Sequence, residues 1–566
     1  MMVSPPDTLI PAAEGPPLPY HADADGQQVF PKRLLTDLIE KAVTHWPDRI
    51  AVDYFGRCWT YREIGALVDR AARGLQDAGL KPGDRFGLCT GNSPYHIVLY
   101  FAALKAGLVV VNLNPLYTPS ELEHLLKDAG VRMVAVPEVR FVHEKFQEVA
   151  RQSGVERLLL CRMKEILPFA LNIGFRLLRR ADHIRITDKA LHLELTDLLA
   201  NAGNPAPVAR QPDDVAVLQY TGGTTGLPKG AMLTHASLAA NSAQMIAHAG
   251  GYMATQQRTL GVLPMFHVFA LTCVLNYSID TGSELVLLPR FEMDKLLASI
   301  RRKPPTQFFG VPTMFNAINQ LPDSKIPDLS RVICCISGGA PLPLEIRQTF
   351  EERTGARVVE GYGLSEASPI ITCNPLFGLV KDNSCGPAFP GTIIEIRDPE
   401  NPARLMPQGE RGEVMARGPQ LMKGYWQKPA ETEATFYEGA LRTGDIGFLD
   451  EDGYLFLVDR IKDLILRGGY NVYPRVIEDA AYHHPEVKEA IAIGIPDDYL
   501  GQVPKLFVAL VPGSTLTADA LAEHLATLIN KLEMPVEIEI RDTLPKTMIG
   551  KLSKKELVEE ERIKRG

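Results

Sequence analysis

A run of glycine and threonine residues that ends in a lysine carries the clearest chemical meaning in the sequence. It extends from Tyr220 to Gly230 and follows the apolar segment Val215–Leu218. Glycine lets a backbone approach a ligand closely, threonine supplies hydroxyl donors and Lys229 adds positive charge, so the run predicts a loop that cradles phosphate groups. The expected contacts are Thr221, Gly222, Gly223, Thr224, Thr225, Gly226 and Lys229. The usual P-loop has glycine before its lysine, whereas this chain has Pro228.

Five further motifs follow in order along the chain. They are SGGAPLP (Ser337–Pro343), GYGLSEASP (Gly361–Pro369), LRTGDIG (Leu441–Gly447), VDRIKDLI (Val458–Ile465) and PKTMIGKLSKKEL (Pro545–Leu557). Together with the phosphate loop they resemble the ordered motifs of the adenylate-forming, or AMP-binding, superfamily. That superfamily includes acyl-CoA synthetases, peptide-synthetase adenylation domains and luciferases. The resemblance covers about residues 30–560 and implies ATP as a co-substrate.

These motifs contain side chains suited to ATP and Mg²⁺. Tyr362 offers a ring on which adenine can stack, although a core tyrosine is the alternative. Glu366 suits a Mg²⁺ ion shared with the ATP phosphates, although a surface glutamate is the alternative; the resemblance adds Thr225 as a second ligand. The family usually has threonine where this chain has Ser365, which keeps the hydroxyl but not the stiffness of a β-branched side chain. Beyond the phosphate loop, the implied ATP-binding residues are Gly338, Gly339, Ala340, Glu360, Gly361, Tyr362, Gly363, Ser365, Asp445, Arg460 and Lys551.

Four of the charged residues have more specific expected roles. Asp445 can accept hydrogen bonds from both ribose hydroxyls, although aspartate is also common in turns, and Arg460 suits the ribose or the α-phosphate. Lys462 matches the family's hinge position. By composition alone Lys551 would be a solvated lysine. Only its match to the family pattern identifies it as the catalytic residue that neutralises charge between the substrate carboxylate and the α-phosphate.

The substrate class is expected to depend on the region between the phosphate loop and Tyr362. LPMFHVFAL (Leu263–Leu271) resembles the acyl-CoA synthetase version of this region. His267 could cap the carboxylate end of a long pocket as a catalytic residue, or it could be a core histidine. Amino-acid-activating relatives place an aspartate near here, and Leu263–Leu275 contains none. The segments Val109–Gly130 and Leu218–His235 resemble bacterial long-chain fatty-acid–CoA ligases.

The segment after the hinge suggests where CoA binds. Gly468, Gly469 and Tyr470 stand in RGGYNVYPRVIED, and paired glycines let a backbone line a narrow channel for the pantetheine arm. A simple hairpin turn is the alternative. The resemblance therefore implies a two-step ligase: a fatty acid and MgATP give acyl-AMP and pyrophosphate, the C-terminal part turns about Lys462, and CoA displaces AMP.

Other functions stay open at this point. One is an adenylating ligase for medium-chain or aryl acids, or one that transfers its acyl group to a carrier protein. Another is a nucleotide-binding regulator without turnover, although such a protein has no use for Lys551. The sequence does not fix the chain length of the substrate or the oligomeric state, a homodimer included.

The elements that must position these residues alternate between helix and strand. The pattern predicts strands at 50–54, 85–90, 109–112, 215–219, 261–263, 284–288, 307–311, 331–337 and 357–360, with helices at 34–46, 61–79, 94–107 and 120–129. Ser120 and Glu123 suit a capping box for the last helix. Alternation of this kind predicts an α/β fold of packed, mostly parallel sheets. We expect a flexible leader at 1–29, a large AMP-binding and acyl-binding domain at 30–459, and a small mobile α+β domain at 460–566.

Composition excludes some partners and locations. The 566 residues carry a net charge of −8, which argues against a dedicated nucleic-acid binder. We expect a cytoplasmic protein, because the first basic residue is Lys32 and no apolar run reaches the ~20 residues of a membrane span. Residues 157–185 are basic, with Ile166, Phe169, Ala170, Ile173 and Leu177 at helical spacing. They predict either weak peripheral contact with the inner face of the membrane or a surface helix whose apolar side packs on the domain.

Overall fold

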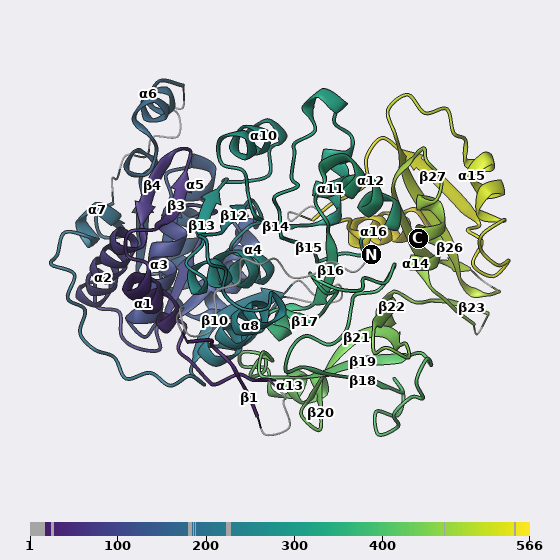
Figure 1. The fold of residues 1–566 in the computed structure, drawn as a ribbon, viewed down its shortest axis with the longest axis horizontal. Coiled ribbons are helices and arrows are strands. Elements are labelled where there is room, and N and C mark those ends of the chain that lie inside the picture. Colours follow the sequence, from purple (N-terminus) through teal and green to yellow (C-terminus); the bar gives the residue numbers. More distant parts are fainter. Residues whose placement is uncertain are drawn as a thin grey trace.

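The computed structural model describes residues 17–23, 28–178, 184, 186, 188–221, 228–468, 470–497, 499–547 and 551–565, with the backbone alone at 176–178 and 565. Two large, mostly parallel sheets form the greater part of the molecule, and two smaller sheets lie toward the C-terminal end of the chain (Figure 1). The short strands β1 (His21–Ala22) and β2 (Gln28–Val29) pair with each other. The predicted α/β class with a smaller α+β part is confirmed.

The first large sheet has seven strands in the order β11-β10-β6-β5-β7-β8-β9, and only β10 and β11 are antiparallel. The strands are β5 (Arg85–Leu88), β6 (Val109–Asn112), β7 (Val131–Pro137), β8 (Arg157–Cys161), β9 (His192–Glu194), β10 (Val215–Thr221) and β11 (Lys229–Thr234). The pairing of β10 with β11 places Lys229 opposite Thr221, so the two ends of the expected phosphate loop are held together.

The second large sheet has eight strands in the order β17-β16-β15-β14-β12-β13-β3-β4. Its interior pairs are parallel, and the pairs β16–β17 and β3–β4 at its two ends are antiparallel. The strands are β3 (Ile50–Tyr54), β4 (Arg57–Thr60), β12 (Arg258–Gly261), β13 (Glu284–Leu287), β14 (Gln307–Gly310), β15 (Cys334–Ser337), β16 (Val359–Gly363) and β17 (Ile370–Cys373). The sequence predicted the parallel strands of this sheet to within a few residues.

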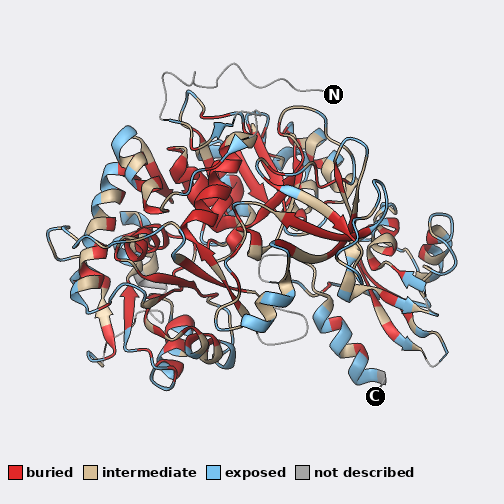
Figure 2. Cartoon of the chain, turned by 90° about the horizontal axis from the view of Figure 1, so that it is seen from below, coloured by how far each residue is buried: buried red, intermediate tan, exposed pale blue. Residues whose placement is uncertain are grey.

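Helices buried on all sides form the centre of the large part. In α3, every residue from Pro94 to Leu104 is buried, and in α8 the same holds from His235 to Ile246. A helix that is apolar all round belongs in a core, and residues of α3 join both large sheets in one hydrophobic cluster. Figure 2 shows the buried residues, in red, gathered in the middle of the molecule. The helices of the large part are α1 (Thr36–His45), α2 (Tyr61–Asp77), α3 (Pro94–Lys105), α4 (Pro119–Ala129), α5 (Arg140–Ala150), α6 (Phe169–Leu178), α7 (Leu195–Leu198), α8 (His235–His248), the π-helix η4 (Ala270–Asn276), α9 (Tyr277–Asp280), α10 (Met293–Arg302), α11 (Pro312–Asn319) and α12 (Leu344–Thr354).

A third, antiparallel sheet follows, which the sequence did not predict. Its strands are β18 (Ile393–Arg397), β19 (Gly412–Arg417), β20 (Phe436–Tyr437), β21 (Ala440–Leu449) and β22 (Leu455–Arg460), with α13 (Pro429–Thr435) between β19 and β20. Ala416 and Leu441 belong to the same hydrophobic cluster as the two large sheets. The third sheet is therefore packed onto the large part.

The C-terminal unit has its own sheet and its own cores. Its strands are β23 (Ile465–Arg467), β24 (Tyr470–Val472), β25 (Val487–Asp497), β26 (Gly501–Leu510) and β27 (Glu537–Arg541), and its helices are α14 (Pro474–Tyr482), α15 (Ala518–Leu525) and α16 (Lys554–Arg565). Two hydrophobic clusters consist only of residues of this unit. The buried ammonium of Lys505 lies 3.0 Å from a carboxylate oxygen of Glu561, which fixes α16 to the sheet.

The predicted cap of α4 is wrong by two residues. Thr118, and not Ser120, is the N-cap: its hydroxyl accepts from the backbone N–H of Glu121, and the Glu121 carboxylate accepts from the backbone N–H of Thr118 at 2.8 Å. Pro119 takes the first helical position, where its fixed φ suits a helix and a missing N–H costs nothing. Glutamates at both 121 and 123 made the two registers hard to separate from sequence.

The basic, apolar segment also differs in detail from the prediction. Ile166 is buried and precedes the helix, because α6 begins only at Phe169. Phe169 is 82% exposed and Ile173 is 45% exposed, so these two residues of the stripe do not pack on the domain, whereas Ile166 joins its core. Arg179 and Arg180 lie outside the described residues, as do the side chains of Arg176 and Leu177.

Among the described residues, no helix has both the length and the apolar character that crossing a membrane requires.

Candidate active site

Lys551 reaches from the C-terminal unit into the loop after β15. A Cβ atom on Gly339 would lie 2.5 Å from Cε of Lys551, so only glycine leaves room for the lysine, and the φ of +83° at Gly339 also favours glycine. Burial, with a smaller contribution from the positive charge of Arg460, lowers the pKa of Lys551 to about 8. A lysine that is packed against a loop at the end of a parallel strand and has a lowered pKa indicates a functional site. Ala340 follows in the same loop and is half-buried.

His267 lies at the same site, in the turn between β12 and η4. Its Nδ1 accepts a long hydrogen bond of 3.4 Å from the backbone N–H of Phe269. Burial and the nearby charge of Lys551 lower the pKa of His267 to about 3, so the imidazole is neutral at physiological pH. The side chain is half-buried rather than enclosed in the core. A neutral imidazole beside a lysine can orient a carboxylate by a hydrogen bond without adding charge.

Tyr362, Asp445 and Arg460 form one connected group at the end of β16. The hydroxyl of Tyr362 donates to Oδ2 of Asp445, and Nε of Arg460 lies 3.2 Å from Oδ1 of the same carboxylate. Asp445 and Arg460 also face each other in the pairing of β21 with β22. Burial raises the pKa of Asp445, and the charge of Arg460 opposes that rise. Each carboxylate oxygen keeps a second lone pair that could accept from a ribose hydroxyl.

Glu366 and Lys229 meet through Tyr425, which the sequence analysis did not single out. The Tyr425 hydroxyl donates to Oε1 of Glu366 at 2.7 Å, and Nζ of Lys229 lies 5.2 Å from the centre of the Tyr425 ring. The positive charges of Arg460 and Lys462 also act on this region: Asp445 and, to a smaller extent, Glu366 raise the pKa of Arg460. Burial lowers the pKa of Lys462, and the charge of Glu366 opposes that fall. Lys229 and Glu366, one expected phosphate residue and one expected metal residue, thus lie on either side of Tyr425. Ser365 begins the short turn that carries Glu366.

Glu360 is a buried carboxylate on β16, next to the loop after β15. The backbone N–H of Leu342 donates to its Oε2 at 3.3 Å, and the Cys385 thiol donates to its Oε1 at 3.5 Å. Burial raises the pKa of Glu360 to about 7, and the charge of Arg475, from the C-terminal unit, opposes that rise. Arg475 is a second residue that the sequence analysis missed. Its place in an RVIED segment gives no sign that it faces Glu360.

At three positions of the site, close contacts leave little or no room for a side chain and so favour glycine. A Cβ atom on Gly338 would lie 3.1 Å from the Phe269 ring, and one on Gly361 would lie 3.3 Å from Ile336. On Gly363 it would lie 1.9 Å from the carbonyl oxygen of Pro369, which excludes any side chain. These glycines therefore let the backbones of β15, β16 and the His267 segment approach one another.

The other expected site residues either lie away from Lys551 or lie outside the described residues. Gly468 has φ +58° and forms a hairpin turn between β23 and β24, as the alternative predicted, and its N–H donates to the carbonyl of Leu500 at 2.7 Å. Tyr470 is 63% exposed. Figure 1 shows β23 at the outer edge of the molecule, away from β15 and β16. Lys462 is exposed in the turn that joins β22 to β23. Gly222, Gly223, Thr224, Thr225, Gly226 and Gly469 lie outside the described residues.

Comparisons with known proteins agree with this geometry. The profile described as "AMP-binding enzyme" matches residues 39–426, and that of the "AMP-binding enzyme C-terminal domain" matches residues 476–551. A long-chain-fatty-acid–CoA ligase of Bacillus subtilis is 38% identical over 96% of this chain and 97% of its own length. A feruloyl-CoA synthase of an Amycolatopsis species is 34% identical over 90% of this chain and 96% of its own.

A solved structure shows the same arrangement of the whole chain. ATP-bound MatB from Rhodopseudomonas palustris is 30% identical, with a TM-score of 0.81 over 93% of this chain and 98% of its own. The apo form of MatB, with the same coverage, gives a TM-score of 0.72. The arrangement described above is therefore closer to the ATP-bound form than to the apo form.

Proposed function

The chain belongs to the family of AMP-binding enzymes, and we propose that it joins a long-chain fatty acid to CoA, using ATP and passing through an acyl-AMP intermediate. One observation carries the proposal: Lys551 of the C-terminal unit is packed against Gly339, beside His267 and Arg460. The fatty acid as substrate is supported by the relatives named long-chain-fatty-acid–CoA ligases, at 35–38% identity.

In the first step, a carboxylate oxygen of the acid attacks the α-phosphorus of ATP. The bond from that phosphorus to the bridging oxygen breaks, and pyrophosphate leaves with the electron pair. Negative charge gathers between the two reactants, so the step needs cations more than a base. Lys551 and Arg460 supply two positive charges there, Lys229 lies on the phosphate side, and neutral His267 orients the carboxylate.

The binding of Mg²⁺ by Glu366 is part of the proposal. The Tyr425 hydroxyl occupies one oxygen of Glu366 and holds the carboxylate in place. A fixed carboxylate beside the phosphate loop fits a hard cation that shares its remaining positions with water and phosphate oxygens. Bound there, Mg²⁺ would neutralise phosphate charge. Thr225, the second expected ligand, lies outside the described residues.

In the second step, we propose that the C-terminal unit turns about Lys462, with the boundary between the two units near residue 460. Lys551 then leaves the site, and the hairpin with Gly468 and Tyr470 approaches the acyl-AMP. The CoA thiolate sulfur forms a bond to the acyl carbon, the bond from that carbon to the phosphate oxygen breaks, and AMP leaves with the electron pair. Two chemistries in one site need two sets of groups, which a rotation can supply in turn.

The experiment that tests this function follows each half-reaction over a series of acids. Pyrophosphate exchange that depends on the acid would report adenylation, and CoA consumption would report thioester formation. We expect both to be highest with long-chain acids. Exchange without CoA consumption would point to another acyl acceptor, and no exchange with any acid would contradict the proposed function.

Aryl acids are a second candidate substrate class, because the feruloyl-CoA synthase is 34% identical over nearly its whole length. The same series decides between the two classes when it includes cinnamic acid derivatives. A higher kcat/KM for an aryl acid than for every alkyl acid would favour the aryl class.

We further propose weak peripheral contact with anionic membranes through α6. Figure 1 shows α6 standing apart from the sheets, and Phe169 at 82% exposure, Leu171 at 47% and Ile173 at 45% present apolar surface to solvent. Three arginines follow in sequence, at 176, 179 and 180. A basic residue near an anionic surface contributes about 1 kcal/mol, and salt reduces that attraction.

Changing Arg176, Arg179 and Arg180 to glutamate should therefore reduce co-sedimentation with anionic vesicles at least about tenfold at low salt. Activity on a soluble short acid should not change. The matched control changes three exposed basic residues elsewhere to glutamate: Lys325, Arg404 and Lys531. Equal sedimentation of the wild type and the arginine triple variant would contradict membrane contact through α6.

A further inference from the structure

Two polar side chains in the core of the large part stand out, because their polar atoms lack close partners. Tyr100 of α3 and Asn276 at the end of η4 are both 0% exposed. Asn276 lies close enough to the Tyr100 phenol to oppose the rise in its pKa that burial causes. Even so, the geometry gives neither the hydroxyl of Tyr100 nor the two polar atoms of Asn276 a hydrogen-bond partner among the described residues.

A third side chain with such an atom, His96, lies on α3 with Tyr100. Nε2 of His96 is buried without a partner among the described residues, and residues four positions apart share one face of a helix, so His96 is a neighbour of Tyr100. Nδ1 of His96 lies 3.4 Å from the hydroxyl of Thr90. Burial lowers the pKa of His96 to about 3, which keeps the ring neutral.

The polar groups next to this cluster are paired. The Ser278 hydroxyl donates to that of Thr259 at 2.7 Å, and the Thr259 hydroxyl donates to Gln307 at 2.6 Å. The Gln307 amide in turn lies 3.4 Å from the hydroxyl of Tyr277. A region that pairs these groups is not loosely packed. Buried polar atoms without partners are rare and destabilising, so Tyr100 and Asn276 call for a polar occupant.

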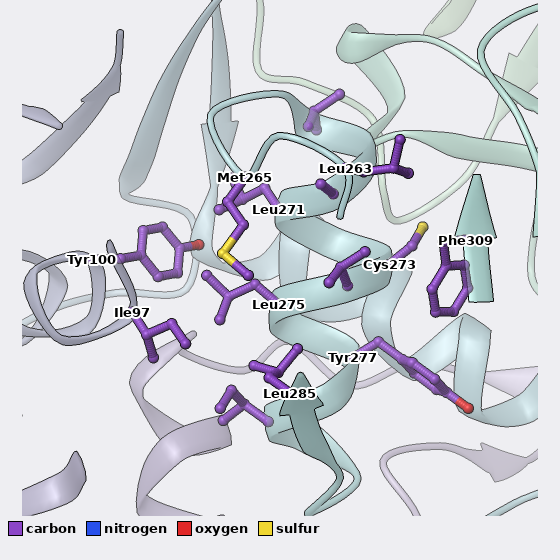
Figure 3. Packing of buried hydrophobic residues seen from close by; sticks show 14 of the residues in the cluster. Ile97, Tyr100, Leu263, Met265, Leu271, Cys273, Leu275, Tyr277, Leu285 and Phe309 are labelled. Atoms are coloured by element: carbon purple, nitrogen blue, oxygen red, sulfur yellow. The ribbon is translucent and has the colours of Figure 1, made fainter. Parts of the chain in front are cut away.

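The position of the cluster relates it to the acyl end of the active site. Figure 3 shows the Tyr100 hydroxyl pointing toward η4, near Met265 and Leu271. The segment Leu263–Leu271 also carries His267. Asn276 stands nine residues after His267, so at roughly 1.5 Å per residue it lies at most about 13 Å away along the helix. A π-helix such as η4 is itself frequent at functional sites.

We propose that Tyr100 and Asn276 bind a hydroxyl group carried on the alkyl chain of the acid. The preferred substrates are then hydroxylated fatty acids, with the hydroxyl on the order of ten carbons from the carboxylate, as the helix length implies. A ligand hydroxyl can donate to the carbonyl of Asn276 and accept from the phenol of Tyr100. The proposal rests on the proposed function, since it requires the carboxylate to lie near His267.

The test compares kcat/KM for hexadecanoic acid with that for its isomers hydroxylated at carbons from about 6 to about 14, a range that brackets the helix length. A site built to pair a hydroxyl discriminates against the analogue without it. We therefore expect one isomer to be preferred at least about tenfold by the wild type. The preference should disappear in Tyr100→Phe, which keeps the ring, and in Asn276→Leu.

The matched control is Tyr277→Phe, a change of the same kind at a neighbouring buried tyrosine whose hydroxyl has a partner. It should leave the ratio between the acids unchanged. If Tyr100 had only a structural role, Tyr100→Phe would change the melting temperature but not the ratio of kcat/KM between the hydroxylated acid and hexadecanoic acid.

Two results would overturn the proposal in different ways. Hexadecanoic acid used as well as every hydroxylated isomer would show that the cluster holds only water, while the proposed ligase function would stand. Failure of every acid in the series to support pyrophosphate exchange would reject the ligase function, and the hydroxyl site with it.

Discussion

Lys551 and Tyr470 belong to the same small C-terminal unit, but their surroundings are opposite. Lys551 fits against Gly339 with its pKa lowered to about 8. Tyr470 is 63% exposed, and its neighbours Leu466 and Tyr499 are 56% and 93% exposed. One end of the unit is thus engaged with the large part, and the other presents apolar and aromatic surface to solvent.

The difference is also one of charge. Arg460, Lys462 and Lys551 gather near Glu366 and Asp445, and such an excess of positive charge suits a polyphosphate. The exposed end around Tyr470 is largely apolar, which suits a pantetheine arm or the face of another unit better than a nucleotide phosphate. The comparison supports the view that one end of the unit serves each half-reaction.

The contacts that hold the unit in place are compatible with movement. His483 of α14 lies 3.6 Å from Glu345, and the Asn316 amide donates to the carbonyl of Lys488 at 3.4 Å. These contacts are long and polar, whereas each unit has hydrophobic clusters of its own. Interfaces of this kind allow relative motion of the units.

The largest expected effect comes from removing the engaged lysine. Lys551→Ala should slow adenylation about 10³-fold, because one cation at the site of developing charge is lost. Thioester formation from preformed acyl-AMP should stay within about twofold, because in the proposed rotation Lys551 faces the site only in the first step. Pyrophosphate exchange and single-turnover thioester formation measure the two rates. If both half-reactions slowed equally, the proposed distinction between the two ends of the unit would be contradicted.

The hinge should give the next largest effect. Lys462→Pro fixes φ near −65° in the turn between β22 and β23, so we expect the second half-reaction to fall about 10²-fold while adenylation changes little. Lys462→Ala is the control that removes the side chain but leaves the backbone free. If the proline variant carries out both half-reactions at wild-type speed, Lys462 is not the pivot.

The lowered pKa of Lys551 predicts a pH dependence. Below about pH 8 the lysine is charged, and above it the lysine loses the proton that adenylation requires. The kcat/KM for ATP should therefore fall about tenfold per pH unit above pH 8. Lys551→Arg should remove this decline, because a guanidinium stays charged. If kcat/KM of the arginine variant declined at the same pH, a group other than Lys551 would be responsible for the decline.

Most of the parallel strands were predictable because they are buried on both faces and read as short apolar runs between helices, but the parallel strands β7, β8 and β9 were not predicted. The antiparallel strands at the sheet edges and those of the third sheet were not predicted either. Strands β4 and β11 lie at sheet edges, and several strands of the third sheet are only half-buried, so their sequences resemble loops. The cap of α4 was misplaced because Thr118 and Ser120 are both followed three residues later by glutamate.

The residues of the site likewise fall into two groups, those that the sequence could predict and those that it could not. Tyr362, Asp445, Arg460 and Lys551 stand in motifs, so a resemblance could name them before any contact was known. Tyr425 and Arg475 act through contacts between distant segments, the first with Glu366 and the second with Glu360. Nothing in the sequence around an isolated tyrosine or arginine distinguishes such a contact from ordinary packing.

The smallest expected effect concerns the exposed end of the unit. Tyr470→Ala should slow the second half-reaction about threefold to tenfold and leave adenylation unchanged, because an exposed aromatic ring makes new contacts only after the unit has turned. Ile563→Ala is the matched control: Ile563 is apolar and 71% exposed, but it lies on α16 and not beside the hairpin. Single-turnover thioester formation measures the effect. Slower adenylation in the Tyr470 variant would mean that this end already contributes to the first step, and the contrast between the two ends would then fail.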